Sequence, residues 1–334
     1  MKKCIIILPY FGKFNNYFNL FLKSCELNPD FNWLIFTDDK SEYNYPANIR
    51  VEYMSFSEFR EIVQKKFDFK IALETPYKLC DYRPAYGYIF QEYIKEYQFW
   101  GYCDCDLIFG KISDFISDDM LKNYDKLFTV GHFSILRNTA EVNTTFMNSI
   151  NGMEYFKTVY SDNNNFAFDE LVFNDIFRNT KLKFYQIDLS YNISVYHYNF
   201  RITRRIPDVN RYFTEDYMPT ITIWDNGVLK RYYFSEDDGR LLNNEYMYIH
   251  LQHRKMNNKL VDFNKYQILP NSFINLNKSD SSINLMNFSG TKKSILSISG
   301  FWKCFLSNIK WKIKSIFRRI NPTKFTRGNM KWIE

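Results

Sequence analysis

Residues 99–110 read FWGYCDCDLIFG, an aromatic, strand-like run in which Asp104 and Asp106 stand one residue apart. Residues at i and i+2 of an extended segment point the same way, so both carboxylates are expected to project together beyond the strand end. Two buried carboxylates in one small space repel each other unless a divalent cation, or a diphosphate carried on one, neutralises them. The stretch therefore predicts a metal–diphosphate site, although an Asp-x-Asp pair also occurs in solvated turns.

The segment just upstream has the spacing of a helix over residues 84–97, with Pro84 suited to a first-turn position. Asp81 would lie near the positive end of the helix dipole. Lys78, Asp81 and Arg83 are therefore expected to cluster at the start of a helix that leads into the Asp-x-Asp strand. An ordinary capped surface helix is the alternative interpretation.

The N-terminal part alternates strand and helix patterns, with apolar runs at 4–8 and 32–37 and a helical pattern near 16–26. Such alternation predicts an α/β fold with a doubly wound parallel sheet, whose ligands bind beyond the carboxyl ends of the strands. Candidate contacts to the base and ribose of a nucleotide are Pro9, Tyr10, Phe11 and Asp38. Further on, residues 191–233 mix short strands with arginines and are expected to form an antiparallel insertion on the acceptor side.

Together, residues 5–12 and 78–111 resemble the GT-A glycosyltransferases, and more narrowly an uncharacterised bacterial family related to capsule and lipopolysaccharide sugar transferases. The resemblance implies a Rossmann-like, mostly parallel sheet flanked by helices. It also implies a hexosyltransferase that uses a nucleotide sugar, such as a UDP-sugar, with Mn²⁺ or Mg²⁺. The acceptor would be a glycan or a lipid-linked saccharide in bacterial surface polysaccharide synthesis. Related enzymes carry Asp-x-x-Arg where this chain has Asp81-Tyr82-Arg83, which is one residue shorter.

The resemblance also implies roles for residues in the motifs. Asp104 would contact the ribose or the ion, and Asp106 and His250 would hold the ion, since imidazole is a good ligand for Mn²⁺-like cations. Arg254 or Lys255 would stabilise the departing diphosphate. A histidine in a strand is otherwise often a packed or surface residue.

Two further segments are candidates for the acceptor side. Asp169 and Glu170 lie in an aromatic run, and either would serve as a general base if the reaction inverts the sugar. Both would equally suit the start of a helix over 171–177. His132 follows an apolar strand at 127–130 and is a candidate acceptor contact.

The resemblance implies a GT-A-like domain over 1–262. Beyond it, composition indicates a polar linker over 263–299 and a basic tail over 300–334. Residues 301–334 hold nine Lys and Arg against one Glu, a net +8, whereas the whole chain carries +7, which leaves −1 for the first 300 residues. Residues 301–320 project as an amphipathic helix with an apolar side and a cationic side. The pattern predicts binding to an anionic membrane surface, with docking on a protein surface as the alternative.

The six cysteines show neither a CxxC pair nor disulfide spacing, which favours a reduced compartment. The apolar run after Met1 stops at Pro9, too early for a signal peptide, and no run is long enough to span a bilayer. The expected location is the cytoplasm, peripheral to the inner face of the cell membrane.

Two alternatives belong to other functional classes. One is a noncatalytic lipid- or nucleic-acid-binding protein that acts through the basic tail. The near-neutral main domain is a poor electrostatic footprint for nucleic acid, so no nucleic-acid partner is expected. The other is a metal-dependent nucleotidyltransferase, which would share the carboxylate pair but act at the α-phosphate.

Overall fold

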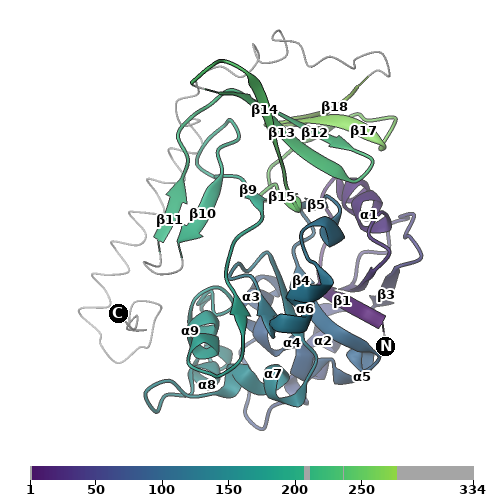
Figure 1. Ribbon diagram of the computed structural model, residues 1–334. Coiled ribbons are helices and arrows are strands. Elements are labelled where there is room, and N and C mark those ends of the chain that lie inside the picture. The colour runs from purple at the N-terminus through teal and green to yellow at the C-terminus, as the bar shows by residue number, and fades with distance from the viewer. Residues whose placement is uncertain (1, 207–210, 236, 277–334) are drawn as a thin grey trace, which may run out of the picture.

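A central sheet organises the first half of the chain in the computed structural model, which describes residues 2–206, 211–235 and 237–276 (Figure 1). The sheet has seven strands in the order β3-β2-β1-β4-β7-β6-β8. Their bounds are β1 (Lys2–Pro9), β2 (Phe31–Thr37), β3 (Ile49–Tyr53), β4 (Tyr97–Cys103), β6 (Lys126–Leu127), β7 (Phe133–Arg137) and β8 (Phe184–Tyr185). The first four are parallel, β7 is antiparallel to β4 and β6, and β8 is parallel to β6.

Helices cover both faces of this sheet because strand residues alternate between two cores. Ile5 and Ile7 pack into one core and Cys4, Ile6 and Leu8 into the other. The first core is covered by α2 (Phe56–Gln64), α3 (Leu79–Tyr82), α4 (Tyr86–Ile89), α5 (Gln91–Ile94), α7 (Ala140–Thr144), α8 (Tyr155–Tyr160) and α9 (Val172–Arg178). The second is covered by α1 (Phe18–Glu26) and α6 (Asp118–Asn123). The predicted α/β class, with a mostly parallel sheet flanked by helices, is confirmed.

The helix expected over 84–97 is broken into shorter pieces. A 3-10 turn at Arg83–Ala85 is followed by α4 and α5, and the chain is already extended in β4 from Tyr97. The break between α4 and α5 falls at Phe90, whose φ of −104° and ψ of 30° leave the helical region. The strand expected at 127–130 is likewise shorter, since β6 ends at Leu127 and Phe128 has a φ of 72°.

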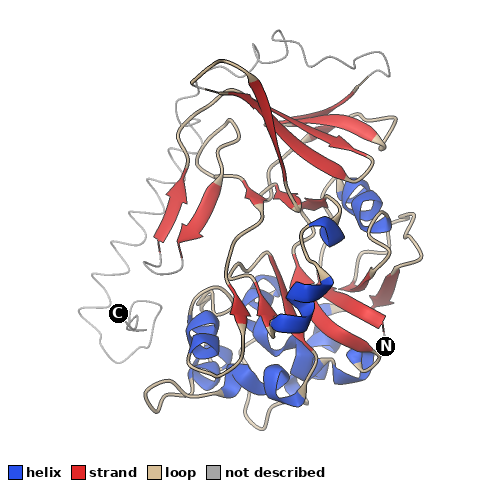
Figure 2. Cartoon of the chain, viewed as in Figure 1, coloured by secondary structure: helices blue, strands red, loops and turns tan. Residues whose placement is uncertain are grey.

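The second half of the chain forms an almost wholly antiparallel sheet, at the top of Figure 1. Its six strands, in spatial order, are β14 (Leu241–Glu245), β13 (Val228–Phe234), β12 (Thr220–Asp225), β17 (Lys265–Leu269), β18 (Ser272–Asn275) and β16 (Asn257–Asn258). Figure 2 shows that the helices gather on the seven-stranded sheet instead. Tyr17 and Leu20 of the α1 region share a buried core with Trp224 and Tyr266, which ties the two sheets together.

The boundary expected at residue 262 is corrected by β17 and β18. These strands lie within the range expected to be a linker, and they pair with each other and with β12. Tyr266 and Ile268 are buried, so the alternation of a strand is present in a segment whose overall composition is polar. The rest of the expected linker and the amphipathic segment 301–320 lie outside the described residues.

A small three-stranded sheet lies between the two larger ones in Figure 1. It has the order β5-β15-β9, made of β5 (Leu107–Phe109), β15 (Tyr248–His250) and β9 (Tyr191–Asn192). An antiparallel hairpin, β10 (Thr203–Ile206) with β11 (Arg211–Thr214), follows β9, which agrees with the antiparallel insertion expected there. Among the described residues, no helix combines the length and the apolar character needed to cross a bilayer.

Candidate active site

A cleft of about 950 Å³ opens beyond the carboxyl ends of β1 and β4. One part of its lining comes from residues that follow these strands, among them Tyr10, Phe11 and Asp104. Other parts come from β9, the β10–β11 hairpin and the segment after β15. The cleft is therefore where the topology of a parallel sheet predicts a ligand.

The three predicted metal ligands lie close together, and two of them, Asp104 and His250, line this cleft. Asp104 follows β4, Asp106 precedes β5, and His250 ends β15, where it pairs with Leu107 of β5. One ligand atom from each of the three side chains lies within 4.8 Å of the others. The His250 Nε2 atom is 3.3 Å from Asp106 Oδ1 and 3.6 Å from Asp104 Oδ2. The pairing of β15 with β5 thus brings His250 next to Asp104 and Asp106, which are far away from it in the sequence.

The hydrogen bonding of His250 leaves its Nε2 atom available to a cation. His250 Nδ1 lies 3.0 Å from the side-chain oxygen of Asn192, and an amide oxygen only accepts, so Nδ1 is assigned the hydrogen. In the neutral ring the lone pair is then on Nε2, which faces the two carboxylates. Burial lowers the pKa of His250, but the nearby carboxylates, Asp106 and Asp104 above all, together outweigh burial and raise the pKa above its ordinary value.

Asp106 is completely buried, and its Oδ1 atom has no hydrogen-bond partner. Burial raises the pKa of this carboxyl, but the charges of His250 and His253 outweigh it and lower the pKa below its usual range. Carboxylate oxygens with one imidazole nitrogen suit Mn²⁺ or Mg²⁺. The side chains present therefore fit a divalent cation, with the orphaned Asp106 oxygen as a ready ligand.

The segment after β15 is strained around the same carboxylate. Gln252 and His253 have φ values of 54° and 53°, in the left-handed region. This turn lets the His253 backbone N–H donate to Asp106 Oδ2 at 2.5 Å, while the Leu251 N–H donates to the Asp106 carbonyl oxygen. Non-glycine residues held there cost on the order of 1–3 kcal/mol each and cluster at functional sites.

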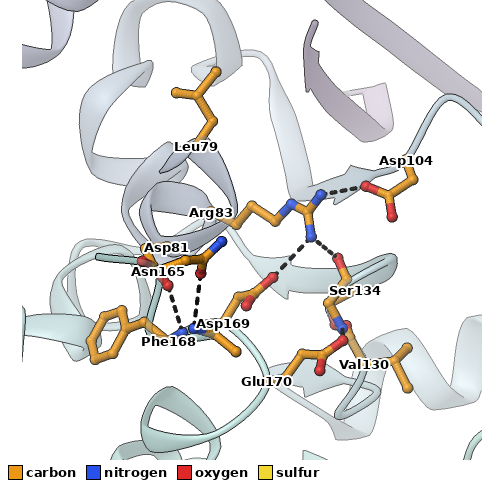
Figure 3. A network of polar contacts seen from close by, with 12 residues as sticks. Leu79, Asp81, Arg83, Asp104, Val130, Ser134, Asn165, Phe168, Asp169 and Glu170 are labelled. Atoms are coloured by element: carbon orange, nitrogen blue, oxygen red, sulfur yellow. Dashed lines mark hydrogen bonds and ion pairs between the residues drawn. The ribbon is translucent and has the colours of Figure 1, made fainter. Parts of the chain in front are cut away.

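Arg83 links Asp104 of the candidate cation site to Asp169 (Figure 3). Its guanidinium donates to Asp169 Oδ2 at 2.9 Å and to the Gly131 carbonyl oxygen at 2.8 Å, and it is also bonded to Asp104. A Cβ on residue 131 would lie 2.5 Å from Asp169 Oδ2, so the close approach needs glycine. Arg83 therefore lies in the cleft, despite the shortened Asp-x-Arg spacing.

The two acidic candidates differ in their surroundings. Asp169 is buried, and burial raises its pKa to about 7 even though the charge of Arg83 opposes the shift. Its Oδ1 atom has no hydrogen-bond partner. Glu170 accepts from the Gly131 N–H at 3.1 Å and from the Tyr212 hydroxyl at 2.8 Å. Both residues line the cleft, ahead of α9.

Lys78 and Asp81 have a structural placement instead of the predicted contact with a nucleotide sugar. They form a buried ion pair with a distance of 2.8 Å between Lys78 Nζ and Asp81 Oδ2. Asp81 also accepts the backbone N–H groups of Phe166 and Phe168, which fixes the segment that precedes Asp169. Neither side chain lines the cleft.

Other predicted contacts are divided between the cleft and its outside. Pro9, Tyr10, Phe11 and His132 line it. His132 is buried, its Nδ1 is 2.9 Å from the Tyr248 hydroxyl, and its Nε2 has no hydrogen-bond partner. Asp38 lies outside the lining, is exposed and accepts the Gly12 N–H.

The basic pair expected to hold the diphosphate also lies outside the lining. Arg254 donates to the carbonyl oxygens of four residues, which are Ser194, His197, Tyr198 and Pro270. Lys255 is exposed. The structure therefore corrects the expectation for Arg254, whose donors are used to hold the chain.

Sequence reasoning missed Asn192, which orients His250, and Tyr212, which holds Glu170. Asn192 also accepts from the side-chain nitrogen of Gln252 at 2.6 Å. A signal for it exists: the polar residues Asp188, Ser190, Asn192 and Ser194 alternate with apolar ones and are all buried. A strand with one buried polar face often lines a site.

Replacing Asn192 by Ala is expected to weaken Mn²⁺ binding about 10- to 100-fold, as loss of a hydrogen-bond partner of a ligating histidine typically does. The ring of His250 would lose the acceptor that fixes its orientation and tautomer. Mn²⁺ titration followed by electron paramagnetic resonance measures the change. Asn123→Ala, which alters an exposed amide on α6, is the control, and an unchanged affinity in Asn192→Ala would contradict the assigned role.

Comparison with known proteins shows the family of the chain and a weak likeness to solved structures. The sequence model of a family of unknown function, DUF6625, matches residues 6–277. No curated protein matches the chain. Among solved structures, the galactosyltransferase LgtC in complex with donor and acceptor sugar analogues is 12% identical, with a TM-score of 0.33, over 57% of this chain and 75% of that one. A likeness of that size assigns no role to any residue of this chain.

Proposed function

This chain belongs to DUF6625, a family of unknown function, and we propose that it is a metal-dependent glycosyltransferase. The donor would be a nucleotide sugar, a UDP-sugar in the first instance, and the acceptor a glycan or a lipid-linked saccharide of a bacterial surface polysaccharide. The observation that carries the proposal is the convergence of Asp104, Asp106 and His250 beside a cleft at the carboxyl ends of parallel strands, where Asp104 and His250 line the cleft.

The proposal assigns the following roles to residues in and beside the cleft. Asp106 and His250 would hold Mn²⁺ or Mg²⁺, and Asp104 would contact the ion or the ribose. When bound, the ion would supply positive charge to the diphosphate as the sugar departs. Tyr10 and Phe11 would form the wall against the nucleotide, and His132 would face the acceptor.

For an inverting reaction, Asp169 would act as the base. The acceptor hydroxyl oxygen would bond to the sugar carbon and pass its proton to Asp169, while the bond from that carbon to the diphosphate oxygen breaks and leaves its electron pair on the diphosphate. A base with a pKa near the working pH is the most effective. The raised pKa of Asp169, about 7, meets that condition.

Turnover is accordingly expected to fall as the pH is lowered through about 7, because protonation removes the base. Asp169→Asn should lower turnover by about 10²- to 10⁴-fold, the usual contribution of general acid–base catalysis. Its affinity for the donor nucleotide should change much less. Asp175→Asn, at an ion-paired aspartate on α9 outside the cleft lining, is the matched control. A pH profile that stays flat from 5 to 8 would exclude Asp169 as the base.

The proposal is tested by calorimetric titration of the purified protein with UDP and with GDP, each with and without Mn²⁺. Metal-dependent binding of one nucleotide supports a donor site and identifies the donor class. Absence of binding by both, in a folded sample, would reject the proposal. With a turnover assay, released UDP indicates sugar transfer, whereas released pyrophosphate indicates the nucleotidyltransferase alternative.

The location is a separate part of the proposal and rests on the sequence pattern of 301–320, outside the described residues. Lys and Arg opposite an apolar side would draw the protein to anionic lipid at the cytoplasmic face of the membrane. Flotation with phosphatidylglycerol vesicles tests this, with phosphatidylcholine vesicles as the control. Equal recovery with both would reject the electrostatic part.

A further inference from the structure

The cleft lacks the basic pair that the sequence motif supplies for a diphosphate. Arg254 donates to four backbone carbonyls and Lys255 lies outside the lining. The basic and imidazole side chains that line the cleft, among the described residues, are Arg83, His132, Arg205, His250 and His253. Arg83 is paired with two carboxylates, and His250 faces the cation site.

Of these five side chains, His253 is the one that borders Asp106 and is still mostly exposed. It lines the cleft next to the cation site, with its Nδ1 atom 3.6 Å from Asp106 Oδ2, while 68% of its side chain is exposed. A divalent cation held by Asp106 and His250 would supply positive charge that attracts phosphate oxygens. An imidazole beside that carboxylate would then be within reach of the same phosphate, without being a ligand of the ion.

The backbone at His253 adds an independent observation. Its φ of 53° is a conformation that glycine adopts freely and that other residues adopt at a cost. The contact that this conformation makes to Asp106 uses only the backbone N–H, so glycine would make it equally well. The imidazole is not needed for this hydrogen bond. It faces the Asp106 carboxylate, with Nδ1 3.6 Å from Oδ2, and it lines the cleft, so its strained position points to a use there.

We propose that the His253 imidazole contacts the outer phosphate of a nucleoside diphosphate bound at the cation site, in place of the Arg254–Lys255 pair. The inference rests on the proposed function, since it needs a nucleotide donor. His253 would donate an N–H to a phosphate oxygen and support the negative charge that builds up there as the sugar leaves. Under this proposal, the ligand expected at the edge of the cleft next to His253 is a diphosphate.

The test uses His253→Gly, which removes the imidazole, keeps the N–H to Asp106 and relieves the strain. Calorimetry would compare wild type and variant for UDP or GDP, whichever the wild type binds with Mn²⁺, and for the matching monophosphate. Loss of a charge-assisted hydrogen bond should raise the diphosphate dissociation constant about tenfold. The monophosphate dissociation constant and the Mn²⁺ affinity, measured by electron paramagnetic resonance, should equal those of the wild type. The thermal midpoint of the variant should be equal to that of the wild type or higher.

Lys255→Ala is the matched control, a basic residue two positions on that lies outside the lining, and it should bind as the wild type does. Diphosphate affinity that is unchanged in His253→Gly, or lost in Lys255→Ala instead, would overturn the inference. So would an equal loss of Mn²⁺ affinity in His253→Gly, which would make His253 a support of the ion. Wild-type protein that binds neither nucleotide would reject the proposed function together with the inference, before any variant is measured.

Discussion

Asp106→Asn is expected to abolish metal-dependent nucleotide binding and to lower sugar transfer by at least about 100-fold, because a cation supplies several kcal/mol to such reactions. The change keeps the size of the side chain and removes one negative charge at a completely buried position. The oxygen that would be replaced, Asp106 Oδ1, lies 3.3 Å from His250 Nε2. A cation held by Asp106 and His250 would therefore lose one of its ligands.

The fold should survive this substitution. The amide oxygen of Asn can still accept the His253 N–H, and the buried charge that needs neutralisation is gone. Calorimetry with Mn²⁺ and nucleotide, a turnover assay and thermal unfolding measure the three effects. Asp38→Asn, at an exposed aspartate outside the cleft lining, is the control. Full turnover in Asp106→Asn would defeat the metal assignment.

Asp81→Ala is expected to destabilise the protein by about 3–5 kcal/mol, the cost of leaving one partner of a buried ion pair alone. The side chains of Lys78 and Asp81 are only 2% and 0% exposed. The substitution would leave the Lys78 ammonium with the Asn164 carbonyl oxygen, and it would remove the acceptor of the Phe166 and Phe168 N–H groups. Equilibrium unfolding in urea measures the difference.

The double variant Lys78→Met with Asp81→Leu separates the charge from the packing. Replacing a buried ion pair by apolar side chains of similar size often leaves a protein no less stable. The loss of stability in the double variant should therefore be smaller than the sum of the losses in Lys78→Met and in Asp81→Leu. Glu154→Ala is the control, because Glu154 and Lys157 form an ion pair with side chains 47% and 53% exposed. That change should cost no more than about 1 kcal/mol. Equal losses in Asp81→Ala and Glu154→Ala would contradict the structural role.

The sheet and the metal cluster could be predicted from the sequence because their signals are local. Strand β1 is a run of apolar residues, and the Asp104–Asp106 pair marks the end of β4 by its spacing alone. His250 could be assigned because it ends an apolar strand and because of the resemblance. The strands β17 and β18 were missed because their buried apolar side chains are few, Tyr266 and Ile268 in β17 and Phe273 in β18, and lie within a polar segment.

The partners of the polar side chains could not be predicted, because they come from residues far away in the sequence. Asn192 is 58 positions from His250, and three of the four carbonyls that hold Arg254 precede it by 56 to 60 positions. A basic residue near a histidine motif has the right charge for a diphosphate, but only the fold determines whether its donors are already used. Lys78 and Asp81 are only three positions apart, and their ion pair is local. The segment at 166–168 that Asp81 holds is far away in the sequence, so this role could not be predicted.

Because β15 lies between β5 and β9, the candidate cation site cannot form during translation until β15 has been made. Asp106 precedes its bonding partner His253 by 147 residues. At the usual 5–20 residues per second, a ribosome needs roughly 7–30 s to add that length. Until then the nascent chain carries the two carboxylates without the histidine, so a polypeptide released before His250 would hold no complete cation site. The candidate cation site is thus expected to become complete only when β15 joins β5 and β9, after most of the chain has been made.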